Sequence, residues 1–571
     1  MHHLGLYAQC GICADMIFRH ERVIALFGND DSTSYRGQTR AFLFPENEPT
    51  MTMVNGFRLC RYPNCQKCAA SPQFIPIHYE CFHIFQQCCE SVDALDQLWT
   101  AAAWRSPWSR ARPIYLSASQ PDTISLEALA RACQLPQLCE LPVELLSMVK
   151  GYSEHALLWR AITAHSLAAR ISTETQAPLL IMSLDDISYW KRGGKPEKDC
   201  EDSLSHMTRV RLTIDSDGIS KIEHMPDQPS KEVYSVSSAY IVERKQTIAK
   251  CSVQLKNGRL RLVLPTGQPP PRIWNTPNPP ELTFCNPYIR GYNPSWQRFF
   301  AVDTGRISGI TFFFSSNRLL SIYPHYSNTS DAMATYRRFS YRRKRDIVWV
   351  YQPISKHDRL LVLGVRESPL GKFSVLVRFE RAGDVVIGSY IPGPAKQDRC
   401  LGQRPPMTLI YNEPIEGQEV SFLCAYSGLT SRVALPKPFA MEKLRSIPNS
   451  LAEGAYLSKA PLADVASAKV FYEEDTKLCK GIMFRYHDGV SRAVGQCRVN
   501  VDATKLVSQP LRFCYRINEA CDRYRQVAHS VQVTLQEEPH RQHGEGWSCH
   551  QLVGMLNFWF TPDSSFITIE N

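Results

Sequence analysis

The stretch LCELPVELLSMVKGYSEHALLWRAITAHSLAAR, residues 138–170, separates a short Cys-rich region from a long strand-rich remainder. Its first half predicts a helix, because Leu141, Leu145, Leu146 and Val149 recur at helical spacing. Pro142 suits the first turn of that helix, where its missing N–H costs nothing. Gly151 is expected to end the helix, and a second helix should follow with Ser153 as its N-cap.

This stretch resembles an F-box in its first helix and in Leu158-Trp159-Arg160. The resemblance implies docking on the adaptor subunit of a cullin-type ubiquitin ligase, while the rest of the chain holds a client. It also implies which side chains bind the partner: Leu141, Pro142, Leu145, Leu146, Val149 and Trp159. The sequence departs from the family by running into one long second helix. The alternative is an ordinary two-helix core that links two domains.

The composition is that of a folded protein with several domains. The chain has 571 residues, of which 44% are hydrophobic and 21% charged, so two to four domains are expected. The net charge of +10 permits acidic partners without requiring nucleic acid. The start MHHLGLYAQC has neither the basic region nor the apolar region of an export signal. No stretch of 18 residues is continuously apolar. We therefore expect an intracellular protein, cytoplasmic or nuclear, that does not cross a membrane.

Three short-spaced pairs near the start predict a zinc site within a module of residues 1–90. They are Cys10 with Cys13, Cys65 with Cys68, and His78 with Cys81, the last pair one helical turn apart. Zinc takes four such ligands in a structural site and leaves no position open. A small segment with weak apolar periodicity would depend on such an ion for stability.

The pairs leave open which four residues hold the ion. Cys10, Cys13, His78 and Cys81 resemble half of a LIM-type module, although the intervening loop is longer. Cys65 and Cys68 with either other pair are the alternative. A cross-braced module with two ions needs eight ligands, and only Cys60 and His83 are spare, so the sequence favours one ion. Without metal, the segment would be a small helical cap containing free thiols.

A helical region is expected over residues 91–190, leading from the Cys-rich module into the F-box-like helices. The apolar period from Phe82 to Trp104 predicts one continuous amphipathic helix. KRGGKPEKDCEDS, residues 191–203, is charged and without period, and it predicts a linker and a domain boundary.

Residues 207–571 predict an antiparallel all-β region with two possible subdomains. Four segments have the pattern strand, turn and strand, with Asp-Gly or a similar pair at the turn; they begin at Arg209, Gly309, Phe373 and Gly481. The form GI-x-F-x-Y-x-x-G at residues 481–489 resembles hairpins of jacalin-type lectins, which implies carbohydrate binding. The strand count suits a propeller, a prism or two sandwiches.

Two further segments of the strand-rich region have distinctive compositions. The proline-rich residues 265–280 cannot be a central strand, so they predict a crossing loop anchored by Trp274. YRRFSYRRKR, residues 336–345, is the most basic segment and has aromatic residues between its arginines. It permits contact with nucleic acid, a nuclear-localisation role, or a solvated turn.

The overall expectation is a multidomain α+β protein with a Cys/His-rich module, an F-box-like helical middle and a large β-region. This layout is similar to that of a group of filamentous-fungal proteins. The enzyme signatures sought in the sequence, including a nucleophile elbow, a phosphate loop and HEXXH, do not occur. We therefore expect a non-enzymatic adaptor with a structural zinc ion and protein partners; carbohydrate binding is the alternative, and nucleic acid is the least favoured ligand.

Overall fold

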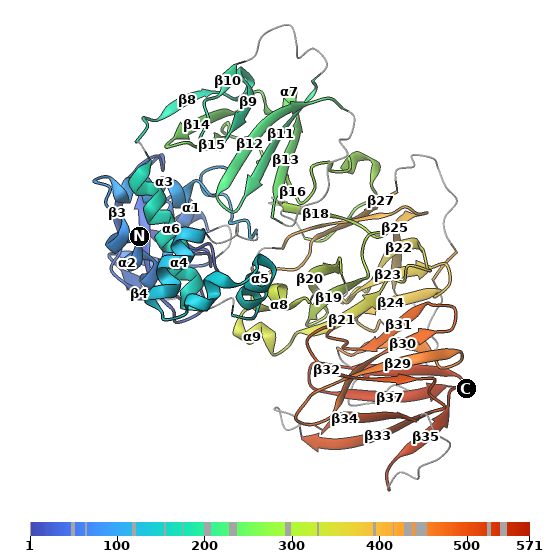
Figure 1. Cartoon of the computed structure of the whole chain (residues 1–571). Helices are drawn as coiled ribbons and strands as arrows, with labels where there is room; N and C mark the ends of the chain where they lie inside the picture. Colours follow the sequence, from blue (N-terminus) through green and yellow to red (C-terminus); the bar gives the residue numbers. More distant parts are fainter. Residues whose placement is uncertain are drawn as a thin grey trace. The chain divides into compact units, whose positions relative to one another are not determined.

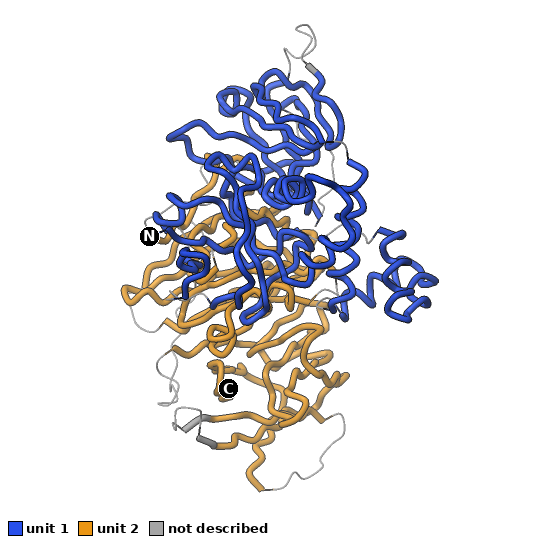
Figure 2. The backbone as a smooth tube through the Cα atoms, turned by 90° about the vertical axis from the view of Figure 1, so that its left-hand side faces the viewer, with its two compact units in different colours: residues 1–279 blue, residues 280–571 orange. Residues whose placement is uncertain are grey.

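The computed structural model describes residues 2–46, 52–62, 65–116, 122–153, 156–174, 176–198, 207–227, 237–291, 298–327, 331–391, 396–414, 416–427, 437–439, 454–521, 527–536 and 545–570. The chain forms two compact units, residues 1–279 and 280–571 (Figure 2). Among the described residues, no helix is long and apolar enough to cross a membrane.

The first part of unit 1 is a small module of short strands and helices. One of its sheets has the order β1-β6-β5, and the other joins β3, β2 and β4, with β7 also pairing with β2. The strands are β1 (His3–Gly5), β2 (Arg22–Gly28), β3 (Tyr35–Gln38), β4 (Phe42–Leu43), β5 (Met53–Val54), β6 (Phe57–Cys60) and β7 (Phe74–His78). The helices are α1 (Gln66–Ala69), α2 (Tyr79–Cys88) and α3 (Ala94–Ala103). The sheets, α2 and α3 share one apolar core.

The single helix predicted from Phe82 to Trp104 is wrong, because the chain breaks between α2 and α3. Cys89 is extended at the end of α2, and the N–H of Glu90 donates to the Ser172 hydroxyl at 3.1 Å. Val92 is fully exposed at the break. The helical spacing of apolar residues continues across the break because α2 and α3 both face the same core.

Four helical segments follow the module: α4 (Thr123–Ala132), the 3-10 helix η1 (Pro136–Glu140), α5 (Val143–Tyr152) and α6 (Leu157–Thr173) (Figure 1). α6 packs on two cores. Trp159 and Ile162 lie with Leu126 of α4 and Leu146 of α5. Ala164, Leu167, Ala168 and Ile171 lie in the core of the Cys-rich module. α6 therefore connects the α4–α5 region to the module.

The predicted end of the first F-box-like helix differs slightly from the structure. α5 continues through Gly151 to Tyr152, and Ser153 is its C-cap rather than the N-cap of the next helix. The Ser153 hydroxyl instead accepts a hydrogen bond from the Trp159 indole N–H at 2.9 Å. It therefore fixes Trp159 beside the end of α5.

The rest of unit 1 consists mainly of antiparallel strands. One sheet has the order β15-β14-β8, and another runs β10-β9-β12-β11-β13-β16. The elements are β8 (Leu180–Ser183), η2 (Leu184–Asp186), β9 (Ile187–Lys191), β10 (Glu197–Lys198), β11 (Arg209–Asp215), β12 (Gly218–Met225), β13 (Ala239–Arg244), α7 (Lys245–Ile248), β14 (Ser252–Lys256), β15 (Arg259–Val263) and β16 (Ile273–Trp274).

The predicted boundary at residues 191–203 does not coincide with the division into units. Residues 191–198 lie in the β9–β10 hairpin, and residues 199–203 are outside the described part of the chain. The units divide after Pro279, within the proline-rich segment. Trp274 is buried there and pairs with Tyr240, so it anchors this segment as predicted. The expectation of a loop throughout is wrong, because Ile273 and Trp274 form the short strand β16 beside β13.

A charged cluster joins the β11–β12 turn to α6 and to the segment after α3. Asp217 lies 3.6 Å from Arg105 and 3.5 Å from Arg170. Burial raises the pKa of Asp217, but the neighbouring guanidinium groups outweigh this effect and lower the pKa to about 2. The Asp217 side chain is therefore ionised, and its contacts with arginines of other elements hold the β11–β12 turn in place.

Unit 2 is built mainly of strands around one large apolar core. Its strands are β17 (Tyr288–Ile289), β18 (Arg298–Asp303), β19 (Gly309–Ser315), β20 (Arg318–His325), β21 (Val348–Pro353), β22 (Leu360–Glu367), β23 (Phe373–Phe379), β24 (Asp384–Gly388), β25 (Gln397–Gln403), β26 (Thr408–Asn412), β27 (Phe422–Tyr426), β28 (Tyr456–Pro461), β29 (Val465–Tyr472), β30 (Cys479–Tyr486), β31 (Ser491–Gly495), β32 (Ala503–Ser508), β33 (Arg512–Cys521), β34 (Val527–Gln536), β35 (Ser548–Gln551), β36 (Met555–Phe560) and β37 (Ser565–Glu570). Its helices are short: η3 (Leu282–Phe284), α8 (Met333–Arg337) and α9 (Tyr341–Lys344).

Unit 2 contains the same kinds of sheet twice along the chain, but the three-stranded sheet comes first in residues 298–426 and the four-stranded sheet comes first in residues 456–570. In residues 298–426, the first strand β18 pairs with β26, which pairs with β27. In residues 456–570, the first strand β28 pairs with β36, which pairs with β37. Between these strands, each segment contributes one four-stranded and one three-stranded sheet: β24-β23-β22-β25 and β20-β19-β21 in the first, β31-β30-β29-β32 and β34-β33-β35 in the second.

The four predicted hairpins are confirmed as β11–β12, β19–β20, β23–β24 and β30–β31. In the last hairpin Gly481 faces Gly495 across the strands. A Cβ on Gly481 would come within 2.8 Å of the Val494 carbonyl oxygen, and Gly495 has a φ of +72°. The glycines of this motif therefore permit a close approach of the two backbones.

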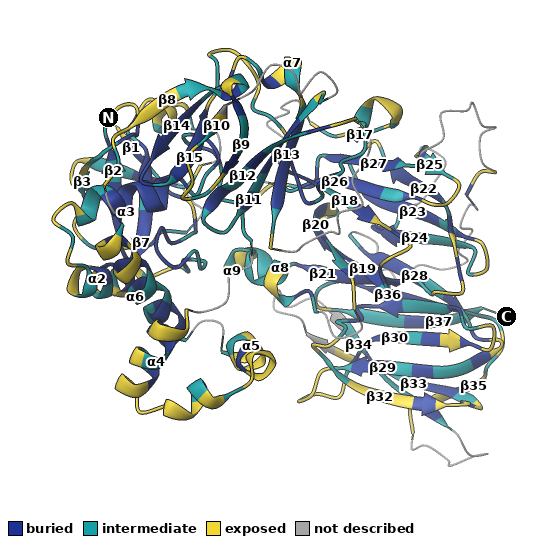
Figure 3. Ribbon diagram, turned by 45° about the horizontal axis from the view of Figure 1, so that its top comes forward, coloured by how far each residue is buried: buried dark blue, intermediate teal, exposed yellow. Residues whose placement is uncertain are grey.

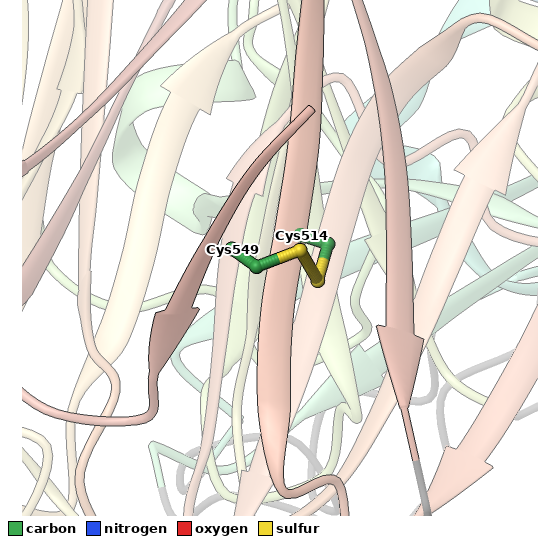
Figure 4. Close-up of a disulfide and its surroundings, with 2 residues drawn as sticks. All are labelled: Cys514 and Cys549. Atoms are coloured by element: carbon green, nitrogen blue, oxygen red, sulfur yellow. A yellow bond between two sulfur atoms is a disulfide. The ribbon is translucent and has the colours of Figure 1, made fainter. Parts of the chain in front are cut away.

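Near the C-terminus, Cys514 of β33 and Cys549 of β35 form a disulfide (Figure 4). They are direct partners in the β33–β35 register. This pairing could not be predicted from the sequence, because the two cysteines are 35 residues apart and only the strand register brings them together.

Candidate metal centre

The first group of potential metal ligands, cluster A, consists of Cys10, Cys13, His78 and Cys81. Their ligand atoms lie within 4.8 Å of one another, and all four residues are buried. Cys10 and Cys13 lie on the loop between β1 and β2. His78 ends β7 and Cys81 lies in the first turn of α2. The strand–helix junction and the loop thus meet at one point.

The loop carrying Cys10 and Cys13 is fixed by its neighbours. The Gly11 N–H donates to the Pro76 carbonyl of β7 at 2.9 Å. A Cβ on Gly11 would lie 2.5 Å from the Ile75 side chain, so glycine is required for this approach to β7. Arg105 donates to the carbonyl of Ile12 at 2.6 Å and to that of Cys10 at 3.3 Å. The loop is therefore held in its ligand-presenting conformation by protein contacts.

The His78 ring points one nitrogen at the thiols and the other at a carboxylate. Its Nδ1 is 3.4 Å from Cys13 Sγ and 3.8 Å from Cys81 Sγ. Its Nε2 is 3.3 Å from Glu21 Oε2. Histidines that bind metal commonly have this arrangement, in which a carboxylate on the second nitrogen orients the ring.

Glu21 is in turn held by Arg160 of α6. The Arg160 Nη1 lies 2.9 Å from Glu21 Oε1, and its Nε lies 3.9 Å from Asp15 Oδ2. The Arg160 side chain is only 9% exposed. A continuous series of contacts therefore leads from cluster A through Glu21 to α6.

The pKa values of these groups follow from burial and mutual contact. Burial raises the pKa of Glu21, but hydrogen bonds to His78 and to the Phe18 N–H lower it to about 2. Burial raises the pKa of Cys10, whereas hydrogen bonds from Cys13 and Cys81 and the neighbouring His78 bring it well below its usual value. Cys10 is thus favoured as the thiolate that binds metal, whereas burial raises the pKa of Cys13 well above its usual value and the hydrogen bond with Cys10 raises the pKa of Cys81 to about 12.

The second group, cluster B, consists of His3, Cys60, Cys65 and Cys68, whose ligand atoms also lie within 4.8 Å of one another. Parallel pairing of β1 with β6 places His3 and Cys60 near each other. Cys65 precedes α1, and Cys68 lies one turn further. His3 and Cys60 are buried, and Cys65 and Cys68 are half-buried.

The structure divides the predicted ligands between these two clusters. Cys10, Cys13, His78 and Cys81 come together as one of the predicted sets, while Cys65 and Cys68 belong to the other group. The expectation that ligands suffice for only one ion is wrong, because His3 supplies the missing position. His83, considered as the spare ligand, is exposed on α2. The spacing C-x4-C-x2-C of Cys60, Cys65 and Cys68 was the signal in the sequence: three closely spaced thiols need a fourth ligand from elsewhere to complete a zinc site.

The side chains implied by the F-box resemblance differ in exposure. Leu146 and Trp159 are buried, and Leu141 packs partly buried beside them. Leu145 and Val149 are exposed, as is Pro142, which is the N-cap of α5. Within α5, Leu146 is buried against Trp159, and most of the helix is exposed (Figure 3).

The basic segment of residues 336–345 is largely used within unit 2. Tyr336 and Phe339 pack partly buried against Trp349. Arg338 lies 3.3 Å from Glu413, and Arg343 donates to the carbonyl of Gly417. Tyr336 and Phe339 thus serve the core of unit 2, and base stacking on either ring would require it to leave that core, whereas Tyr341 is 67% exposed.

The chemistry available at cluster A is that of a closed metal site. Three thiols and one imidazole supply all four positions of a tetrahedral ion, so none remains for water or a substrate. No protein-family model matches the chain, and a search of curated proteins found no match.

The series from cluster A to α6 predicts a large effect for Arg160→Leu. Loss of the guanidinium leaves Glu21 and Asp15 without their buried cation, and we expect the free energy of unfolding of unit 1 to fall by about 3 kcal/mol. Urea denaturation measures the change. Arg131→Leu is the matched control, because Arg131 pairs with Glu127 on the surface and is 73% exposed; its effect should stay below about 1 kcal/mol. Equal effects would contradict a structural role for the series.

Proposed function

We propose that the chain is a non-enzymatic substrate receptor whose cluster A holds a structural zinc ion. In this proposal α5 and its neighbours bind the adaptor subunit of a cullin-type ubiquitin ligase, and unit 2 holds the client. The observation that carries the proposal is the exposed apolar side of α5, described below. The metal module supports that side through α6.

Zinc is the metal best suited to cluster A. Three sulfur donors favour zinc over magnesium or calcium, which prefer oxygen ligands. The complete burial of the four ligands and the Glu21 carboxylate on His78 fit a structural ion. The binding of such an ion contributes to folding, on the order of 10 kcal/mol for small zinc modules.

The outward side of α5 has the character of a docking surface. Its exposed apolar residues are Val143, Leu145, Met148, Val149 and Tyr152. Met148 is 55% and Tyr152 89% exposed, and both lie on α5, the first of the two helices that the F-box resemblance assigns to the adaptor. Such a concentration of apolar side chains on one short helix is typical of a surface that a partner covers.

The surface is supported from beneath by a rigid base. Leu146 and Trp159 are buried below it, and the Trp159 indole is hydrogen-bonded to Ser153 at the end of α5. α6 continues from this base into the core of the metal module. Binding of a partner to α5 would therefore require no new ordering of the helices that carry it.

The adaptor proposal predicts that Leu145→Glu with Met148→Glu weakens binding at least about tenfold without unfolding the chain, because both side chains are exposed. Calorimetry with a purified adaptor subunit measures the affinity, and circular dichroism verifies folding. Leu506→Glu is the control, since Leu506 is 65% exposed on β32 of unit 2. An adaptor that does not bind the unsubstituted chain, or binds the α5 variant equally well, would refute the proposal.

A second candidate function is carbohydrate binding by unit 2. It is favoured by a connectivity found in both residues 298–426 and 456–570: the first strand pairs with a late one, and one three-stranded and one four-stranded sheet lie between them in the sequence. Two consecutive prisms of three sheets would have this connectivity, and the β30–β31 hairpin resembles those of jacalin-type lectins.

This second candidate predicts that the full chain binds glycans on an array and is displaced by the free sugar. The Leu145→Glu and Met148→Glu variant should bind the same glycans, because α5 belongs to unit 1. An array on which no glycan retains the chain would remove the candidate and leave the adaptor proposal intact.

A further inference from the structure

We propose that cluster B binds a second zinc ion, so that the module is braced by two ions with interleaved ligands. This goes beyond the proposed function, which needs only the ion at cluster A. It is carried by the geometry of His3, Cys60, Cys65 and Cys68.

The donors of cluster B come from two directions. His3 and Cys60 lie on the paired strands β1 and β6, with Gly5 opposite Cys60. Cys65 and Cys68 lie on one turn of chain, and Cys65 Sγ is 3.4 Å from His3 Nδ1. Three thiols and one imidazole within 4.8 Å of one another form a complete tetrahedral set for zinc.

Contacts other than metal already hold these donors in place. The His3 N–H donates to the Ser71 hydroxyl at 2.9 Å. Arg110 donates to the carbonyls of Cys68, Ala69 and Ser71. The end of α1 and the residues after it are therefore held by the Arg110 guanidinium on their carbonyls, and an ion entering cluster B would meet preorganised ligands.

A glycine permits the close packing at this site. A Cβ on Gly5 would lie 3.2 Å from Cys68 Cβ and 3.3 Å from Cys68 Sγ. Most side chains at position 5 would therefore push the Cys68 thiol out of place. Gly5 lies in β1, two residues after the ligand His3. This short strand therefore supplies one ligand, His3, and leaves room at Gly5 for another, Cys68.

The ligands of the two clusters alternate along the chain. His3 of cluster B precedes Cys10 and Cys13 of cluster A; Cys60, Cys65 and Cys68 of cluster B precede His78 and Cys81 of cluster A. The segment closed by each ion thus contains ligands of the other. Two ions in this arrangement would constrain the unfolded chain more than two sites in succession.

The clusters differ in burial, which predicts different rates of zinc release. All ligands of cluster A are buried, whereas Cys65 and Cys68 of cluster B are half-buried. A chelator reaches a half-exposed thiolate sooner than a buried one. Cluster B should therefore lose its ion first, and cluster A should lose its ion more slowly.

Elemental analysis and native mass spectrometry of the full chain test the proposal. We expect two zinc ions per chain, released in two kinetic phases of equal size by a colorimetric chelator. Cys65→Ser with Cys68→Ser should retain one ion and lose the fast phase. Cys88→Ser, which removes a half-buried free thiol of α2 outside both clusters, should retain both ions.

Two results would overturn the second site: one ion in the unsubstituted chain, or an unchanged ion count in the Cys65 and Cys68 variant. If that variant fails to fold, the release kinetics of the unsubstituted chain still test the proposal. A single release phase with one ion per chain would refute the second zinc site. The adaptor proposal is unaffected by either result, because it requires only cluster A.

Discussion

The contact between Arg160 and Glu21 links the two functional parts of unit 1. Glu21 orients the imidazole of His78 in cluster A, and Arg160 lies on α6 next to Trp159, which supports α5. The Arg160 side chain is buried and the Glu21 side chain is half-buried, so removing either would leave the charge of its partner poorly compensated. The arrangement of the cluster A ligands and the placement of α6 beneath the proposed docking surface therefore share the same ion pair.

This dependence gives the metal a role in the proposed function even though it performs no chemistry. The sheets, α2 and α3 of the module share one apolar core, and a structural ion would add a further constraint where its ligands meet. Zinc at cluster A would fix the junction of β7 with α2, and the apolar contacts of α6 with the module would transmit that rigidity to α4 and α5. Unit 2 has a large core of its own and needs no such support.

The sequence predicted those features that depend on local pattern. The hairpins starting at Arg209, Gly309, Phe373 and Gly481 have alternating apolar residues and turn signals, and all four were predicted. His3 was missed because only the parallel pairing of β1 with β6 brings it to Cys60. The break after Cys88 was missed because both helices face one core. Arg160 belonged to a predicted motif, but its contact with Glu21 arises from tertiary packing.

Amide hydrogen exchange of the full chain, with zinc bound and after its removal by a chelator, tests the link between cluster A and α6 most directly. The account predicts faster exchange across residues 157–173 once cluster A is empty, and unchanged exchange in the β29–β30 hairpin of unit 2. Loss of zinc from cluster A with no change of exchange in α6 would contradict it.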